Sequence, residues 1–336
     1  MTIKDIAKES GVGLGTVSRV LNEQNGVSEA TREKVQAVID KYGFVLNQNA
    51  KLLKTQERRT IVILIKGSSN IFLNSLLEGI QKRLEPLPYT TDVVVIDEYD
   101  NEAQRACRCF YERKPAGMIF LGGNPDVHKD DFAKVQIPCV IISNFAYSVD
   151  NPNLSSVSID DREASACMAE YLLKKGHSKI GIIGGNMDSP EPARRRFEHF
   201  TKTLAKHGVD FDSKRNFVAA KYSFEDSAQA ARTLLKQTPD ITAIFTMADV
   251  MAIGAIRALK DMGYSVPEDI SVTGFDGLEL AKFYCPSLTT IQQKNELLVE
   301  QGLSLLLDRI EHHKPCKHIL VPFEFIEGES VRSIGD

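Results

Sequence analysis

The stretch GVGLGTVSRVLN, residues 11–22, predicts a short amphipathic helix with an unusual free face. Val17, Val20 and Leu21 are spaced at i, i+3 and i+4, so they share one face of a helix. The opposite face carries small or polar residues, namely Gly15, Ser18, Arg19 and Asn22, with Thr16 beside it. A glycine weakens a helix by roughly 0.5–1 kcal/mol relative to alanine. Its presence near the start of this helix therefore indicates a requirement other than stability.

Two more helices are expected beside this stretch. Thr2 can cap the first one, with Asp5 at the capping-box spacing, and Gly11 ends it. The third is expected to begin near Ser28 and to stop at Gly43, and its apolar residues at i, i+3, i+4 and i+7 are Val35, Val38, Ile39 and Tyr42. Two short helices joined by a glycine turn fit a helix-turn-helix motif, whose second helix lies in the DNA major groove.

A helix-turn-helix would explain the free face. Small side chains at Gly15, Thr16 and Ser18 let the backbone approach DNA closely. Arg19 and the helix N-terminus can hold phosphates, and Leu14 can contact a thymine methyl group. The pattern alone is equally compatible with a small helical bundle that has a polar outer face.

The chain has 336 residues, so two or more domains are expected. Its net charge of −4 is unevenly spread, because residues 1–60 hold ten lysines and arginines against seven aspartates and glutamates. A mildly basic head on an acidic body fits nucleic-acid binding. The N-terminus lacks a signal-peptide core, no run of about 18 apolar residues occurs, and the six cysteines are scattered. We therefore expect a cytoplasmic protein with reduced thiols and no membrane segment.

From Thr60 onward, apolar runs alternate with amphipathic helices. The runs are TIVILI, DVVVID, GMIFL, CVIIS, KIGIIG, FVAAK, AIFTM and ISVTGF. Continuous valine and isoleucine runs with helical crossovers predict parallel sheets that are covered on both faces. The unit occurs twice, with a break near residues 155–165, so the fold class is α/β with two doubly wound sheets. Residues 47–54 are expected to form a short linker helix before them, which is marginal in water on its own.

Five stretches resemble the lactose/galactose-repressor family of transcription regulators: TIKDIAKESGVGLGTVSRVLN, VSEATREKVQAVIDKYGF, KKGHSKIGIIGG, VPEDISVTGFD and PSLTTIQQ. They span nearly the whole chain in the family's order. The resemblance implies a helix-turn-helix head joined by a hinge to two subdomains of the periplasmic-binding-protein type. The implied divisions are a head of residues 1–46, a hinge helix and linker of 47–58, and an effector-binding and dimerisation body of 59–336. Within the body, subdomain one comprises residues 59–160 and 293–322. Subdomain two comprises residues 161–292 and 323–330.

The resemblance also implies a set of DNA-contacting residues. They are Thr2, Leu14, Gly15, Thr16, Ser18, Arg19, Asn22, Thr31, Asn47, Ala50, Leu53 and Lys54. Leu53 matches a leucine that wedges into the minor groove and kinks the duplex, although KLLK is also compatible with a solvated linker. Gly13 replaces the family's serine N-cap, Leu46 replaces a proline, and Gly15 has no side chain at a base-reading position. Specificity is then expected to rest on neighbouring side chains and on DNA shape.

In the family, the effector binds between the two subdomains at the carboxyl ends of strands. The matching residues are Phe72, Ser143, Asn144, Arg196, Asp249, Asp276 and Gln293. Phe72 can pack on a sugar face, while Arg196 and Asp276 can hold neighbouring hydroxyls by charge-assisted hydrogen bonds. Alternatively, Arg196 and Asp276 form surface or interdomain pairs, and Asp249 caps its helix. Ser143 stands where the family often has aspartate, and Ala248 where it usually has asparagine. These departures put a plain hexose in doubt or imply other partners, such as Asn144 and Gln293.

Other kinds of site find little support. Residues 311–318, EHHKPCKH, match no common zinc spacing, so no metal is expected. No nucleophile–base pair or phosphate loop is visible, so neither an enzyme nor a cofactor is expected. A sugar-binding protein of the same body fold, without a regulatory role, is the alternative, but it would need a signal peptide and no head.

We therefore predict a ligand-regulated transcription factor that represses carbohydrate-utilisation genes. It is expected to bind double-stranded operator DNA and to respond to a sugar or a sugar derivative. The resemblance implies a homodimer. A tetramer tethered by C-terminal tails is not expected, because no leucine-heptad tail follows the last strand.

Overall fold

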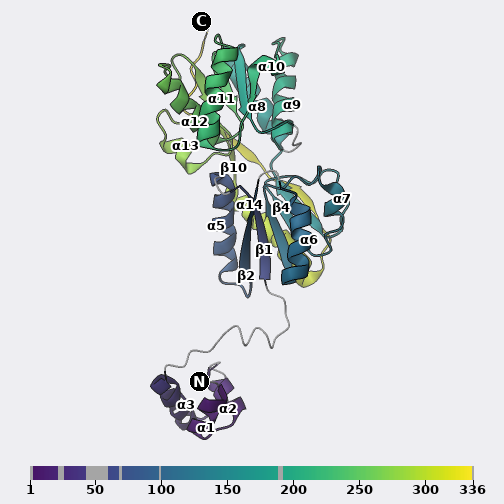
Figure 1. The fold of residues 1–336 in the computed structure, drawn as a ribbon, viewed down its shortest axis with the longest axis vertical. Coiled ribbons are helices and arrows are strands. Elements are labelled where there is room, and N and C mark those ends of the chain that lie inside the picture. The colour runs from purple at the N-terminus through teal and green to yellow at the C-terminus, as the bar shows by residue number, and fades with distance from the viewer. Residues whose placement is uncertain are drawn as a thin grey trace. The chain divides into compact units, whose positions relative to one another are not determined.

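The computed structural model describes residues 3–21, 26–42, 60–67, 70–97, 100–187 and 192–334. The chain divides into two compact units, Met1–Glu57 and Arg58–Asp336, which we call the head and the body. Figure 1 draws the head in purple and the body from blue to yellow. Each unit has buried apolar clusters of its own.

The described part of the head consists of the three predicted helices, α1 (Ile3–Ser10), α2 (Leu14–Leu21) and α3 (Glu29–Tyr42). Their buried side chains meet in one cluster, formed by Ile6, Ala7, Val17, Val20, Val35 and Ile39. Gly11 joins α1 to α2 with a φ of +65°, which glycine adopts without strain. Tyr42 does not continue the apolar face as its spacing predicts. It is exposed, and its hydroxyl donates to Glu9 Oε1 at 2.6 Å.

The first sheet of the body has six parallel strands in the order β11-β5-β4-β3-β1-β2. They are β1 (Thr60–Lys66), β2 (Thr90–Ile96), β3 (Gly117–Leu121), β4 (Cys139–Ile142), β5 (Leu154–Ser158) and β11 (His318–Leu320). Helices α5 (Ile71–Leu84) and α14 (Asn295–His312) cover one face, and α6 (Glu102–Arg113) and α7 (Lys129–Phe132) cover the other (Figure 1). Side chains alternate along β1, so Ile63 faces α5 and α14 whereas Leu64 faces α6. These elements form the first subdomain.

The second sheet has four parallel strands in the order β7-β6-β8-β9. They are β6 (Ile180–Gly184), β7 (Phe217–Ala219), β8 (Ala243–Thr246) and β9 (Ser271–Thr273). The helices around this sheet are α8 (Asp161–Lys174), α9 (Ala193–Lys206), α10 (Ser213–Asn216), α11 (Phe224–Gln237), α12 (Asp249–Asp261) and α13 (Glu279–Phe283). Phe200 of α9 stacks on Phe245 of β8, with 4.4 Å between ring centroids. These elements form the second subdomain.

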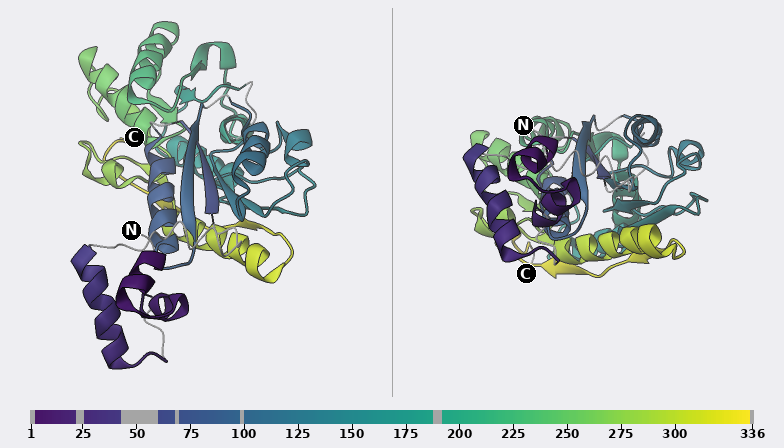
Figure 2. Two further views of the ribbon diagram at one scale, coloured as in Figure 1. Left: turned by 60° about the horizontal axis from the view of Figure 1, so that its bottom comes forward. Right: turned by 90° about the horizontal axis from the view of Figure 1, so that it is seen from below.

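The chain passes between the two subdomains three times. The passages follow β5, β10 (Thr290–Gln293) and β11, and β10 pairs antiparallel with β12 (Phe323–Ile326). Figure 2 shows α14, in yellow, lying along the first subdomain although it is encoded after the whole second sheet. Any rotation of one subdomain against the other would have to bend all three connections together.

All eight predicted apolar runs form strands, but β5, β10, β11 and β12 were not predicted. The predicted break near residues 155–165 begins too early, because β5 lies inside the first sheet. Its sequence LSSVS contains no apolar run. Ser156 is nevertheless accommodated, since its hydroxyl lies 2.8 Å from His318 Nδ1 and accepts the Ala146 N–H at 3.2 Å.

Among the described residues, no helix is long and apolar enough to cross a membrane. The same residues contain no group of three or more histidines, cysteines and carboxylates that could hold a metal ion. In the 311–318 stretch, the Cys316 thiol is directed to the Pro152 carbonyl at 3.1 Å.

Candidate functional site

The outer face of α2 is the first candidate site. It presents Leu14, Gly15, Ser18 and Arg19 as exposed residues, with Thr16 half-buried beside them. The Gly13 carbonyl accepts the N–H groups of Thr16 and Val17 at 2.9 and 3.2 Å, so the helix begins where a glycine N-cap predicts. Thr31 is half-buried in the first turn of α3, where its hydroxyl oxygen lies 2.8 Å from that of Ser28.

Six residues expected to contact DNA lie outside the described part of the chain: Thr2, Asn22, Asn47, Ala50, Leu53 and Lys54. The linker helix expected over residues 47–54 lies in the same segment. The minor-groove wedge and the hinge helix therefore stay predictions.

The second candidate site is a cavity of about 120 Å³ between the two subdomains. Its wall residues come from the carboxyl ends of parallel strands in both sheets. Six of the seven residues expected to contact an effector line it: Phe72, Ser143, Asn144, Arg196, Asp276 and Gln293. Wall residues that the sequence did not reveal include Lys66, Asn70, Asn124, Asn186 and Tyr222.

Arg196 is held firmly at the start of α9. Its Nε donates to Asp161 Oδ1 at 2.7 Å, and its Nη1 donates to the Met247 carbonyl at 2.6 Å. The guanidinium lies 3.6 Å from the ring centroid of Phe275, and Nη1 lies 3.9 Å from Asp276 Oδ1. The alternative of a surface or interdomain ion pair is wrong, because the Arg196 side chain is only 4% exposed and both carboxylates belong to its own subdomain. Asp161 was missed because nothing in the sequence links the start of α8 to α9.

Asp276 is fixed by the β10 strand. Its N–H donates to the Ile291 carbonyl at 2.8 Å, and Gln293 Nε2 donates to its Oδ1 at 2.8 Å. Its φ of +107° is rare for a residue with a side chain, and such backbone strain concentrates at functional sites. Burial raises the pKa of Asp276 to about 7, although the nearby Arg196 charge acts in the opposite direction.

The first subdomain contributes Phe72, Asn70 and Asn144 to the cavity wall. Phe72, in the first turn of α5, is 4% exposed, and Asn70 caps that helix by accepting the Leu73 N–H at 3.1 Å. Asn144 Nδ2 donates to the Gly123 carbonyl at 2.6 Å, so this amide fixes the loop after β3.

Asp249 does not line the cavity, and the prediction that it contacts the effector does not fit its position. The cap position of α12 belongs to Ala248, so the alternative of an N-cap is also wrong. Asp249 is fully buried, where it accepts the Thr290 hydroxyl at 2.6 Å and the Leu278 N–H at 2.7 Å. Burial raises its pKa well above the usual range, and the Asp276 charge adds to this. We therefore assign Asp249 to the support of the β9–α13 loop.

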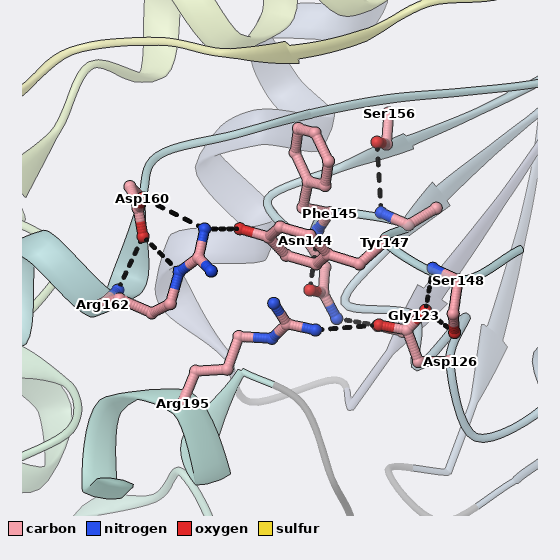
Figure 3. A network of polar contacts seen from close by, with 11 residues as sticks. Gly123, Asp126, Asn144, Phe145, Tyr147, Ser148, Ser156, Asp160, Arg162 and Arg195 are labelled. Atoms are coloured by element: carbon pink, nitrogen blue, oxygen red, sulfur yellow. Dashed lines mark hydrogen bonds and ion pairs between the residues drawn. The ribbon is translucent and has the colours of Figure 1, made fainter. Parts of the chain in front are cut away.

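A polar clasp joins the two subdomains near the cavity (Figure 3). Arg195 of α9 forms an ion pair with Asp126 of the first subdomain at 2.9 Å, and its guanidinium lies 3.6 Å from the Tyr147 ring centroid. Arg162 of α8 donates to the Tyr147 hydroxyl at 3.2 Å. Cation–π contacts of this kind are worth about 0.5–2 kcal/mol. The clasp therefore favours the arrangement in which the subdomains are close together.

Family comparisons agree with this architecture. Residues 2–47 match the model for bacterial regulatory proteins of the lacI family, and residues 169–331 match the periplasmic binding protein-like domain. The HTH-type transcriptional regulator MalR of Clostridium butyricum is 32% identical over 346 residues, covering 99% of this chain and 100% of that protein. The ribose operon repressor of Escherichia coli K12 is 30% identical over 313 residues, covering 92% and 93%.

Solved structures show the same fold. A lacI-family regulator from Silicibacter pomeroyi has a TM-score of 0.78 and 26% identity, covering 99% of both chains. The lac repressor dimer bound to operator and the anti-inducer ONPF has a TM-score of 0.81 at 24% identity, again covering 99% of both chains. From its helix-turn-helix head, its two-subdomain body and these relatives, the chain belongs to the lacI family of bacterial regulatory proteins and is a DNA-binding transcription regulator.

Proposed function

We propose that this protein is a cytoplasmic, homodimeric repressor of carbohydrate-utilisation genes, whose affinity for operator DNA is set by a sugar or a sugar derivative in the body cavity. The observation that carries the proposal is the buried Arg196–Asp276 arrangement on the cavity wall of a chain that also carries a DNA-binding head. The family head at residues 2–47 speaks against a sugar-binding protein without a regulatory role.

The charges around the cavity favour an uncharged ligand. The two cations among the described wall residues are already paired with carboxylates, Lys66 with Glu102 and Arg196 with Asp161. Within the described part of the wall, a phosphorylated sugar would therefore meet no unneutralised positive charge. Hydroxyl groups suit the site better, because they accept hydrogen bonds from arginine and amide groups and donate to carboxylates.

A thermal-shift screen tests the ligand class. The purified protein would be heated with D-ribose, D-glucose, D-galactose, maltose and cellobiose, each also tested against an unrelated protein. A ligand at 100 times its Kd adds about 2.7 kcal/mol to the free energy of unfolding, which raises Tm by several degrees. If none of these sugars stabilises the protein but glucose 6-phosphate or a nucleobase does, the effector belongs to another ligand class and the proposal is wrong.

The operator is expected to be a roughly two-fold symmetric sequence, because each chain carries one helix-turn-helix and the proposed repressor is a dimer. The affinity is expected to fall steeply with salt, with a logarithmic slope near −0.9 for each phosphate neutralised. Selection from random duplexes followed by sequencing measures the first property, and titration at several salt concentrations measures the second. Recovery of single half-sites alone would contradict the dimer.

Gly15→Ala separates helix stability from DNA contact. A Cβ at Gly15 would meet nothing within 4 Å in the head, so alanine is expected to stabilise α2 by roughly 0.5–1 kcal/mol. Operator affinity is nevertheless expected to drop, because the added methyl group stands where the backbone approaches the duplex. Fluorescence anisotropy with operator and with a scrambled duplex measures both affinities. Unchanged operator affinity would remove Gly15 from the DNA interface.

A further inference from the structure

A buried ion pair stands at the first-subdomain wall of the cavity. Lys66 is the last residue of β1, and its Nζ lies 2.7 Å from Glu102 Oε2 on α6. The two side chains are 6% and 1% exposed. β1 lies between β3 and β2, so its carboxyl end is a position from which a side chain can reach a ligand in a parallel sheet.

Glu102 is anchored independently of the lysine. Its Oε1 accepts the backbone N–H of Asn124, a residue that lines the cavity. A Cβ on Gly123 would lie 3.1 Å from the same oxygen, so the loop after β3 wraps closely around the carboxylate. Glu102 therefore holds both the lysine and the loop in place.

The ion pair leaves hydrogen-bonding capacity unused. Within the described residues, neither Lys66 Nζ nor Glu102 Oε2 has a hydrogen-bond partner beyond their mutual contact. An ammonium group carries three donors, and buried donors without partners are rare in folded proteins. A buried ion pair is also weak as a stabilising device, because desolvation offsets its attraction. Lys66 lines the cavity, so a bound molecule is the group that can use these donors.

We propose that Lys66 is a specificity-determining contact for the effector, with its ammonium donating to an uncharged oxygen of a polyhydroxylated ligand, and that Glu102 is the positioning residue behind it. The inference rests on the proposed function and adds a ligand contact from the first subdomain. The Lys66 ammonium is buried, so the lysine side chain shifts towards the ligand on binding. Glu102 neutralises the lysine, and this disfavours phosphate or carboxylate groups at the same position.

The test uses the full-length double variant Lys66→Met/Glu102→Gln. Removing the lysine alone would leave a buried carboxylate unpaired and would destabilise the fold. Glutamine at position 102 keeps an oxygen for the Asn124 N–H. Tm, operator affinity without sugar, and the Kd of whichever of ribose, glucose, galactose, maltose and cellobiose binds the unmodified protein would be measured by calorimetry and anisotropy.

The double variant is expected to retain its Tm and its operator affinity and to bind the sugar at least about tenfold more weakly. The matched control is Lys179→Met/Asp240→Asn, which removes an exposed ion pair of 2.9 Å and is expected to leave Kd unchanged. Lys66→Arg keeps the charge pair but moves the donors, so it is expected to fold and to lose sugar affinity as well.

Unchanged sugar affinity in both Lys66 variants would overturn the inference and assign the pair a structural role. Absence of sugar binding in the unmodified protein would instead overturn the proposed ligand class, and this inference with it. If the double variant fails to fold, the sugar affinity of Lys66→Arg decides the question.

Discussion

Arg196→Leu is expected to lower the free energy of unfolding of the body by roughly 3–5 kcal/mol and to abolish sugar binding. The substitution leaves Asp161 and Asp276 buried without their cation, and it leaves the Met247 carbonyl without its donor. Chemical denaturation followed by intrinsic tyrosine fluorescence measures the loss, and calorimetry measures the binding.

Arg194→Leu is the matched control on the same helix. Its ion-pair partner Glu198 is half exposed, and exposed pairs of this kind contribute about 0–1 kcal/mol. The double variant Arg196→Leu/Asp161→Asn is expected to recover part of the stability, because it removes one of the stranded charges, but not the sugar binding. If Arg196→Leu is as stable as Arg194→Leu, the buried contacts of Arg196 do not contribute the free energy of unfolding that we assign to them.

Asp276→Asn is expected to weaken sugar binding by roughly 10–100-fold, as the loss of one charge-assisted hydrogen bond predicts, and to leave operator affinity without sugar nearly unchanged. Asparagine can still accept from Gln293 Nε2 and tolerates the positive φ at this position. Operator affinity would be measured with and without sugar in both proteins. A full response in the variant would remove Asp276 from the effector site. Loss of operator binding without sugar would assign it a structural role.

The same variant gives a test of the raised pKa of Asp276. A carboxyl group with a folded pKa of about 7 binds its proton more tightly in the folded state than in the unfolded state. Its contribution to stability is therefore full below about pH 4 and is lost as the pH rises to 7, by at most about 1.4 kcal/mol per pH unit. The difference in unfolding free energy between the native protein and Asp276→Asn should fall over this range and level off above it. Denaturation at several pH values measures the difference.

The sequence predicted the parts of the fold that have strong periodicity. The valine and isoleucine runs identified eight strands, and the apolar spacing identified all three helices of the head. The serine-rich β5 was missed because its polar groups are satisfied by partners such as His318, which is distant in sequence. Nothing local to residues 154–158 reveals that partner.

The candidate site was predictable only where a family pattern covered it. Phe72, Arg196 and Asp276 were assigned in this way, and they line the cavity. Lys66 was missed, although a lysine that ends the otherwise apolar run TIVILIK was an available signal. The pairing of Arg195 with Asp126 could not be predicted, because it depends on which loops of two sheets meet.

The three passages of the chain between the subdomains impose an order of assembly during synthesis. The head is complete early, and the second sheet is contiguous, but the first sheet waits for α14 to cover Ile142 and its neighbours. At about 5–20 residues per second, β5 precedes the end of α14 by roughly 8–30 s. During that interval a nascent chain carries the DNA-binding head and a sheet face that α5 covers only in part, because α14 is not yet made. We therefore expect fragments released by ribosomal stalling in this window to keep the head and to expose the part of the apolar face that α14 covers in the full chain.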